Sequence, residues 1–173
     1  LASSRHDRNR ALLMSGDDKV VVLGSGGHAR AVAEAATSSG FAVEEFLGLD
    51  HNDNTFKALL QRISLLDLSS TSLALGVGTN HVRARLHQRV ITTFPHAVFP
   101  PIIHRTAWVS TDGAIDDGAI LLAFASVGPG AHARVGSLLN TGASLDHDST
   151  VGDYGSLGPG ARTGGDVSIG SRT

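Results

Sequence analysis

A six-residue repeat runs through the second half of the chain and constrains its fold more than any other feature. Starting at Val109, every sixth residue is aliphatic, apart from the short Ala133 and the polar Thr163. The residue two positions earlier is small at each step from Ala107 onward, except at Val167. Glycine recurs directly after the aliphatic position, at Gly128, Gly152, Gly158, Gly164 and Gly170.

Such a hexapeptide repeat predicts a parallel β-helix. Residues two apart in a strand share a face, so each aliphatic residue and its small partner point into a narrow interior together. Three sides make one coil, and neighbouring coils stack at about 4.8 Å. We expect the recurring glycines to turn the corners between sides. A flexible glycine-rich linker has no reason to keep an aliphatic residue at every sixth place.

Composition narrows the classes of function. The 173 residues are 41% hydrophobic, carry a formal net charge of −2 and include no cysteine. We therefore expect no nucleic-acid or membrane partner, no disulfide, and a cytoplasmic protein. Residues 1–18 are predicted to be a disordered extension. The repeats stop at Thr173 without a cap, so we expect the β-helix to be truncated at its C-terminus.

An α/β unit precedes the repeat. The apolar run Lys19–Leu23 predicts a buried strand, and a turn rich in glycine leads from it into an alanine-rich helix. A strand, a glycine turn and a helix in this order can present backbone N–H groups to a phosphate. The last helix of the unit is expected to be capped by Asn80. The remaining expected elements are strands over 45–49 and 73–77 and helices over 30–37, 56–62 and 80–94. We predict a Rossmann-like domain over residues 19–97 and the β-helix over residues 98–173.

The glycine turn alone leaves two other readings open. It can be a tight turn that only packs a helix on a sheet, or part of a dinucleotide dehydrogenase. A dehydrogenase would carry an acidic residue about 20 residues beyond the motif. Asp50 instead comes late, at the far end of the second predicted strand, and no second half of a doubly wound sheet follows. We therefore expect a small domain that binds one phosphorylated or sugar group.

The repeats contain one cluster suited to proton transfer, Asp146-His147-Asp148. His147 lies two residues after the inward Leu145, so it belongs to a corner and not to the core. A carboxylate beside an imidazole holds one ring nitrogen and favours the imidazolium, which suits a general base. The other reading is an ordinary surface histidine, as we expect for His132, which has no flanking acids.

The surroundings of His147 on neighbouring coils also bear on its role. Gly165 is expected one coil above His147, where its N–H would stabilise an oxyanion. We expect no metal, because the positions one coil away from His147 are Pro129 and Gly165 and offer no second histidine.

From about Val20 onward the chain resembles the bacterial sugar acyltransferases of the sialic acid O-acetyltransferase family. That family includes N-acetyltransferases of nucleotide-linked amino sugars. The resemblance is carried by the segments VVLGSGGHAR, LALGVGTNHVRARL and NTGASLDHDSTVGDYGSLGPGARTGGDVSIG. It implies a Rossmann-like domain followed by a left-handed β-helix, a homotrimer with active sites between subunits, and acetyl-CoA as co-substrate without a metal.

The resemblance also implies residue roles. His147 matches the general base, Asp148 the acidic residue that orients it, and Asn140 a polar residue of the same pocket. Gly165 matches the backbone amide over the thioester carbonyl, and Ser156 stands where many members carry a histidine that contacts acetyl-CoA. The positions that match the nucleotide-sugar site are Gly26, Gly27, His28, Asp50, His51 and Gly78.

Together these features predict an acetyl-CoA-dependent N-acetyltransferase acting on a nucleotide-activated amino sugar. One alternative is a sialic acid O-acetyltransferase. Another is a non-catalytic trimeric hexapeptide scaffold that binds a nucleotide-sugar. A dehydrogenase is the reading with least support.

Overall fold

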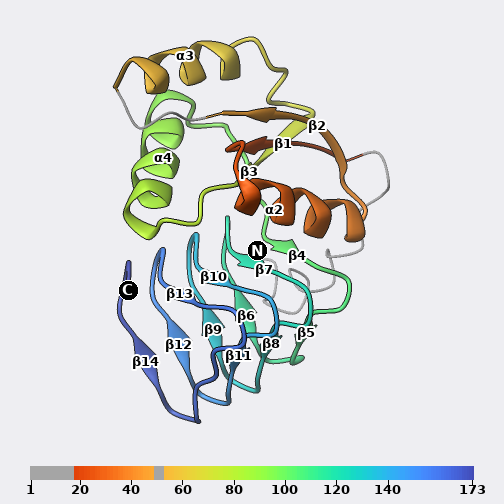
Figure 1. Ribbon diagram of the computed structural model, residues 1–173, viewed down its shortest axis with the longest axis vertical. Helices are drawn as coiled ribbons and strands as arrows, with labels where there is room; N and C mark the ends of the chain where they lie inside the picture. The colour runs from red at the N-terminus through yellow and green to blue at the C-terminus, as the bar shows by residue number, and fades with distance from the viewer. Residues whose placement is uncertain (1–17, 49–52) are drawn as a thin grey trace, which may run out of the picture.

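An α/β domain stacks on a column of three-sided coils in the computed structural model (Figure 1), which describes residues 18–48 and 53–173. The α/β domain consists of β1 (Lys19–Leu23), α2 (Gly27–Ser38), β2 (Ala42–Leu47), α3 (Asp53–Ile63), β3 (Thr71–Leu75) and α4 (Asn80–Thr93). None of the helices in the described ranges is long and apolar enough to cross a membrane.

The three strands of the α/β domain form a parallel sheet in the order β2-β1-β3. The central strand β1 is buried from Val20 to Leu23, as its continuous apolar run predicts. The turn after β1 needs glycine: Gly24 has φ +144°, and a Cβ there would collide with the carbonyl of Gly76. The loops after β1 and β3 therefore meet at the carboxyl edge of the sheet.

Several local predictions in this domain were inaccurate. Helix α3 begins at residue 53 instead of 56, and β3 spans Thr71–Leu75 instead of residues 73–77. Helix α2 begins at Gly27 instead of Arg30, and β2 begins at Ala42 instead of Glu45. The N-cap of α4 is Thr79, and Asn80 is the first helical residue. Asn80 does not cap the helix because its amide is engaged elsewhere: Nδ2 donates to the Thr173 carbonyl at 2.7 Å, and Oδ1 accepts from Ser156 Oγ at 2.6 Å.

The coils contain eleven two-residue strands, β4 to β14, and these strands form the three sides of a β-helix. We name its sheets by their strands: sheet B is β4 (Ile102–Ile103), β7 (Ile120–Leu121), β10 (Leu138–Leu139) and β13 (Ser156–Leu157); sheet C is β5 (Trp108–Val109), β8 (Ser126–Val127) and β11 (Ser144–Leu145); sheet D is β6 (Ala114–Ile115), β9 (His132–Ala133), β12 (Thr150–Val151) and β14 (Ser168–Ile169). All pairings are parallel, and partners are 18 residues apart, as in Leu121 with Leu139. The predicted three-sided coil is confirmed.

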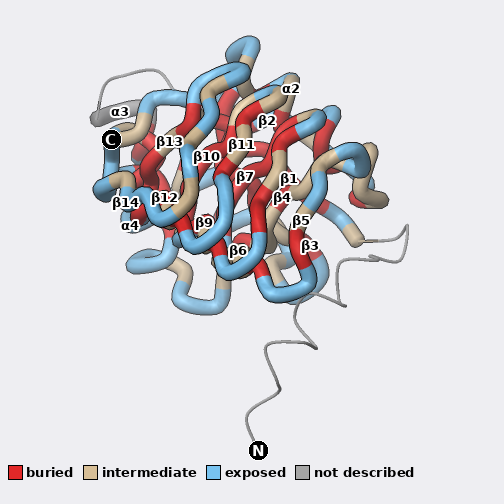
Figure 2. The backbone as a smooth tube through the Cα atoms, turned by 90° about the horizontal axis from the view of Figure 1, so that it is seen from below, coloured by how far each residue is buried: buried red, intermediate tan, exposed pale blue. Residues whose placement is uncertain are grey.

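The interior of the β-helix follows the predicted pair of inward positions. The aliphatic residues Leu121, Val127, Leu139, Leu145 and Val151 are all fully buried. Their small partners, from Ala119 to Ser149, are buried to the same degree. Figure 2 shows the result as buried strands alternating with exposed corners along the coils. Each coil therefore contributes one layer of a continuous apolar core.

The corners are turned by different residues from those predicted. From Ile115 onward, the residue that adopts the left-handed conformation is the third after each position of the aliphatic column, and these residues are Gly118, Phe124, Gly130, Gly136, Gly142, Asp148, Tyr154, Gly160, Asp166 and Arg172. The glycines that directly follow the aliphatic residues do not have positive φ. Gly128 is needed for another reason, because a Cβ there would meet the backbone of His147 at 2.9 Å. Close stacking of coils explains that glycine.

The α/β domain covers the outer face of sheet B. Outward residues of this sheet, Ile102, Ile120 and Leu138, are almost completely buried and share one apolar cluster with the core of the α/β domain. Helix α2 contacts β4 and lies between the small sheet and the first coils (Figure 1). The outward positions of the other two sheets are mostly polar or small. Only sheet B is therefore suited to carry the domain.

Candidate active site

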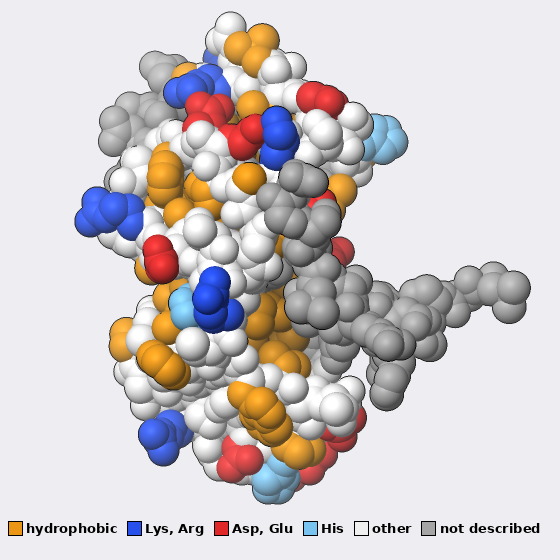
Figure 3. All heavy atoms as spheres, turned by 90° about the vertical axis from the view of Figure 1, so that its right-hand side faces the viewer, with side chains coloured by type: hydrophobic (Ala, Val, Ile, Leu, Met, Phe, Trp, Pro, Cys, Tyr) orange, Lys and Arg blue, Asp and Glu red, His pale blue; other side chains and the backbone are white. Residues whose placement is uncertain are grey.

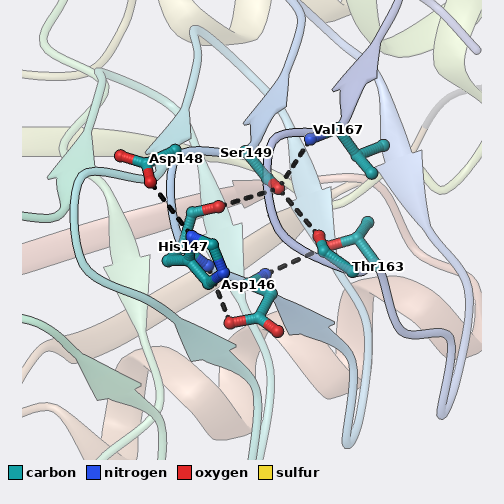
Figure 4. A network of polar contacts seen from close by, with 7 residues as sticks. Asp146, His147, Asp148, Ser149, Thr163 and Val167 are labelled. Atoms are coloured by element: carbon teal, nitrogen blue, oxygen red, sulfur yellow. Dashed lines mark hydrogen bonds and ion pairs between the residues drawn. The ribbon is translucent and has the colours of Figure 1, made fainter.

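His147 stands at the corner between sheets C and D, between β11 and β12. Its side chain is 57% exposed, so it lies outside the core. Its Nδ1 lies 3.0 Å from Asp148 Oδ2, and Asp146 Oδ1 accepts the backbone N–H of His147 at 2.7 Å (Figure 4). The fold thus brings one imidazole and two carboxylates together at a solvent-exposed corner.

The electrostatics of this corner favour proton uptake by the ring. The pKa of His147 is raised, first by the hydrogen bond with Asp148 and then by the negative charge of Asp146. When Nδ1–H donates to Asp148, Nε2 is the nitrogen that accepts a proton. Asp148 adopts φ 56°, a left-handed conformation that aspartate tolerates better than most residues. The arrangement has the elements of a general base and its orienting acid.

The backbone at Gly165 lies directly against the Nε2 edge of the ring. A Cβ built on Gly165 would overlap His147 Nε2 and Cε1, whereas one on the neighbouring Gly164 would meet nothing within 4 Å. Neither glycine has a positive φ. The requirement for glycine at position 165 is therefore steric, and the atom that imposes it belongs to His147.

The coil above His147 departs from the regular ladder at this corner. A single bridge between Ser144 and Arg162 replaces a full strand of sheet C. Three backbone bonds remain: Ser144 N–H donates to the Ala161 carbonyl at 2.9 Å, Thr163 N–H to the Ser144 carbonyl at 3.0 Å and Asp166 N–H to the His147 carbonyl at 2.9 Å. The Gly164–Asp166 turn therefore keeps most backbone bonds to the His147 corner, but it lacks a bond from the Asp146 N–H to the Thr163 carbonyl, whose equivalent one coil below joins Gly128 to Leu145.

Two side chains complete the attachment (Figure 4). Thr163 Oγ1 accepts the backbone N–H of Asp146 at 2.9 Å. Ser149 Oγ donates to the Gly164 carbonyl at 2.9 Å and accepts the Val167 N–H at 3.0 Å. Thr163 is the polar exception in the aliphatic column of the hexapeptide pattern, and Val167 is the large exception in the small column. The repeat breaks where the backbone must lie against His147, which is a signal that could have identified Thr163 from sequence.

Two other predicted site residues lie away from this corner within one chain. Asn140 stands at the corner between sheets B and C, where its Oδ1 accepts the Thr141 N–H at 2.8 Å. Ser156 lies on β13 of sheet B, half-buried, and its hydroxyl contacts Asn80 and Arg83 at the edge of the α/β domain. Neither residue is brought to His147 by the fold of a single chain.

The glycine loop of the α/β domain lies at the carboxyl edge of its sheet. Gly26 is the N-cap of α2 and Gly27 its first residue. The ring of His28 packs against Gly78 from the loop after β3, where an added Cβ would lie 3.5 Å from His28 Cγ. Burial, and then the charge of Arg83, lower the pKa of His28. The predicted positions Asp50 and His51 lie outside the described residues.

His132 has an acidic partner that the sequence analysis missed. It lies on strand β9 and not at a corner, and its Nε2 is 2.9 Å from Asp116 Oδ2 on the coil below. The two residues are 16 positions apart, so for a histidine on a strand the acidic partner is found on the neighbouring coil and not among the flanking residues. Among the described residues, no group of three or more His, Cys, Asp or Glu side chains is placed to hold a metal ion.

Comparison with known proteins found relatives of the α/β domain alone and of the α/β domain together with the β-helix. Residues 19–90 match the family described as the PglD N-terminal domain. The acetyltransferase domain of PglB from Neisseria gonorrhoeae, solved with acetyl coenzyme A, is 26% identical; the match covers 90% of this chain and 86% of that chain with a TM-score of 0.71. PerB from Caulobacter crescentus, solved with CoA and GDP-perosamine, is 25% identical, with 88% and 83% covered and a TM-score of 0.68.

The fold defined by these matches is that of sugar acetyltransferases in which an α/β domain precedes a left-handed β-helix. A variant of the Caulobacter crescentus GDP-perosamine N-acetyltransferase with one histidine replaced by alanine, 24% identical, matches with a TM-score of 0.73. The predicted fold class is confirmed, and so is the predicted class of enzyme, an acyltransferase. The matches do not distinguish the sialic acid O-acetyltransferase group within that class.

Proposed function

We propose that this protein transfers an acetyl group from acetyl-CoA to the amine of a nucleotide-linked amino sugar, with His147 as general base. The observation that carries the proposal is the His147 corner, where an exposed imidazole paired with Asp148 lies against the backbone of Gly165. Of the solved relatives, PglB was solved with acetyl-CoA and PerB with CoA plus GDP-perosamine. The chemistry of the corner fits those molecules.

In the proposed mechanism the sugar amine attacks the thioester carbonyl carbon while His147 Nε2 removes the amine proton. Asp148 stabilises the imidazolium through Nδ1–H. The backbone N–H of Gly165 donates to the carbonyl oxygen as it becomes negative. The carbon–sulfur bond then breaks, the acetyl group stays on nitrogen, and the CoA thiolate takes up a proton. No covalent enzyme intermediate and no metal take part in this scheme.

The remaining predicted residues belong to the same proposal. Asn140 is a proposed contact of the acceptor sugar, and Ser156 is a proposed contact of acetyl-CoA. Gly26, Gly27, His28, Asp50, His51 and Gly78 are proposed to bind the nucleotide-sugar, which places its phosphates near the N-terminus of α2. The cytoplasmic location and the domain boundaries expected from the sequence stand as further parts of the proposal.

A homotrimer would complete the site. Sheet C lies between the Asn140 corner and the His147 corner, and it carries Trp108, which is 56% exposed. Phe124, 70% exposed, adopts φ 61° at the corner between sheets B and C, one coil below the Asn140 corner, and this conformation costs a bulky residue about 1 kcal/mol. Figure 3 shows apolar side chains on the surface of the coils. Burying this face against a second copy would bring an Asn140 corner to a His147 corner.

Sedimentation velocity tests the trimer. Wild-type protein is expected to sediment as a trimer, and Trp108→Lys with Phe124→Lys as a monomer without activity. A wild-type protein that sediments as a monomer and still transfers acetyl groups would contradict the shared site.

The substrate class is tested by release of free CoA thiol. Acetyl-CoA is mixed with a panel of UDP- and GDP-linked amino sugars, their N-acetylated forms and free sialic acid. We expect thiol release with at least one nucleotide-linked amino sugar and none with its N-acetylated form. Release with sialic acid alone would support the O-acetyltransferase instead. Tight nucleotide-sugar binding without any thiol release would support the non-catalytic scaffold.

A further inference from the structure

Arg83 is a fully buried cation whose partners join the two parts of the molecule. It lies in the first turns of α4 and has no exposed surface. Among the described residues its partners include no carboxylate, and most of them are backbone carbonyl groups. A buried charge without a counter-ion is costly, so its hydrogen bonds must be numerous and well directed.

One set of these bonds goes to the coils. Nε donates to the Gly136 carbonyl at 2.8 Å, and Nη2 donates to the Tyr154 carbonyl at 3.0 Å. Gly136 and Tyr154 are left-handed corner residues on neighbouring coils, and an added Cβ at Gly136 would clash with the Tyr154 ring. The guanidinium therefore donates hydrogen bonds to the backbone carbonyls of two adjacent corners.

The other set goes to the loop after β3. Nη1 donates to the Gly78 carbonyl at 2.8 Å and to the Val77 carbonyl at 3.2 Å. Gly78 is the residue against which the ring of His28 packs, and among the described residues His28 Nε2 is buried without a hydrogen-bond partner. One planar group thus fixes the loop that supports His28 and the coils at the same time.

We propose that Arg83 is a positioning residue for the nucleotide-sugar site, holding the Val77–Gly78 loop and the His28 ring in register with the β-helix. This inference rests on the proposed function, since it assumes that His28 and Gly78 contact the nucleotide-sugar. Arg83 itself touches neither substrate in this scheme. Its planar fork reaches carbonyls on both sides, which the single ammonium of lysine cannot do.

A matched control is available at the same interface. Tyr154 Oη lies 2.9 Å from His87 Nδ1, a buried bond that also joins α4 to the coils, and the ring of His87 packs edge-on against Phe99. Tyr154→Phe removes this bond without touching Val77 or Gly78. Both Arg83→Lys and Tyr154→Phe should therefore weaken the interface, but only the first should release the loop.

The test combines kinetics with hydrogen exchange on the whole protein. For Arg83→Lys we expect the KM for the nucleotide-sugar to rise at least fivefold with kcat changed less than twofold, and the KM for acetyl-CoA to rise by a smaller factor, because Arg83 also donates to Ser156. Amide exchange in the 76–79 loop should accelerate at least tenfold relative to that of β1. Tyr154→Phe should lower the melting temperature but leave the KM for the nucleotide-sugar, and the exchange rate of the 76–79 loop relative to β1, as in the wild type. If Arg83→Lys does not fold, Arg83→Met, which keeps the volume without the charge, replaces it.

The outcomes separate the inference from the function on which it rests. Equal changes in Arg83→Lys and Tyr154→Phe would show that Arg83 only stabilises the fold, and the inference would be wrong. A loop that exchanges no faster in the variant would overturn it as well. If the wild type transfers no acetyl group to any nucleotide-sugar, the proposed function fails, while the exchange result still reports on Arg83.

Discussion

The corner that carries His147 and the interface that holds Arg83 treat a basic side chain in opposite ways. His147 is exposed and its pKa is raised by two carboxylates, so it can gain and lose a proton. Arg83 is buried among carbonyls, and burial lowers its pKa to about 10, which still leaves it charged at neutral pH. Exposure with adjustable charge suits chemistry, whereas burial with fixed charge suits positioning.

The backbone is regular around Arg83 and irregular around His147. Arg83 contacts corners that keep the regular coil, such as Gly136 and Tyr154. The corner above His147 lacks one ladder bond, from the Asp146 N–H to the Thr163 carbonyl, and the hydroxyls of Thr163 and Ser149 supply further hydrogen bonds there. Four predictions test whether the irregular corner serves the reaction while the regular ones serve stability.

The largest effect is expected for Gly165→Ala. Its methyl group must displace the His147 ring, because both occupy the same space. We expect kcat to fall about a hundredfold or more, on the scale of losing a general base. The matched control is Gly164→Ala, which meets nothing and should retain activity within twofold. Equal activity in the two variants, measured by thiol release, would place the reaction elsewhere.

Thr163→Val separates activity from stability. Valine restores the aliphatic pattern but cannot accept the Asp146 N–H. We expect an unchanged or higher melting temperature together with a kcat about tenfold lower, because the Gly165 backbone shifts relative to the ring. Thr150→Val, an outward change on sheet D, should alter neither quantity. A fully active Thr163→Val would mean that the break in the repeat has no part in catalysis.

Ser149→Ala and Ser137→Ala compare two buried serines of the small column. Ser149 makes three hydrogen bonds at the irregular corner, whereas Ser137 Oγ has no partner among the described residues. We expect Ser149→Ala to lower the free energy of unfolding by about 1–2 kcal/mol and Ser137→Ala to change it by less than about 0.5 kcal/mol. Chemical denaturation measures both. Equal losses would argue against a special role for Ser149.

The smallest effect is a shift in the pH dependence of kcat/KM. The base must be neutral to accept a proton, so activity falls as pH drops through the pKa of His147. Asp148 is the main cause of the raised pKa, and Asn tolerates the same left-handed backbone. Asp148→Asn should therefore move the acid limb to lower pH, and Asp146→Asn should move it less in the same direction. An unmoved limb would mean that another group titrates.

The sequence predicted the coils well because their period reports the geometry of the core directly. An aliphatic residue at every sixth place, with Leu139 above Leu121 and below Leu157, leaves one register possible. The same period placed Gly165 above His147. The structure shows that Asn140 and His147 lie on different corners, a separation that only an assembly of chains would remove.

What escaped prediction depends on contacts between segments far apart in the chain. Glycine was assigned to the wrong corner position because close stacking at Gly128 resembles a turn signal in sequence. The sequence shows apolar residues on the outer face of sheet B, at Ile102, Ile120 and Leu138. The neighbouring residues do not indicate that the α/β domain covers this face. Asn80 was taken for a helix cap because its partners, Arg83 and Ser156, are set by the packing of the domain on the coils.

The central claim is that an exposed corner imidazole removes the proton from the acceptor. Its most direct test is the rate of CoA release from acetyl-CoA, with the best nucleotide-linked amino sugar, for wild-type protein and for His147→Ala. The account predicts that kcat falls between about a hundred- and ten-thousandfold while the binding of nucleotide-sugar stays within twofold. A His147→Ala variant that keeps the wild-type rate would contradict it.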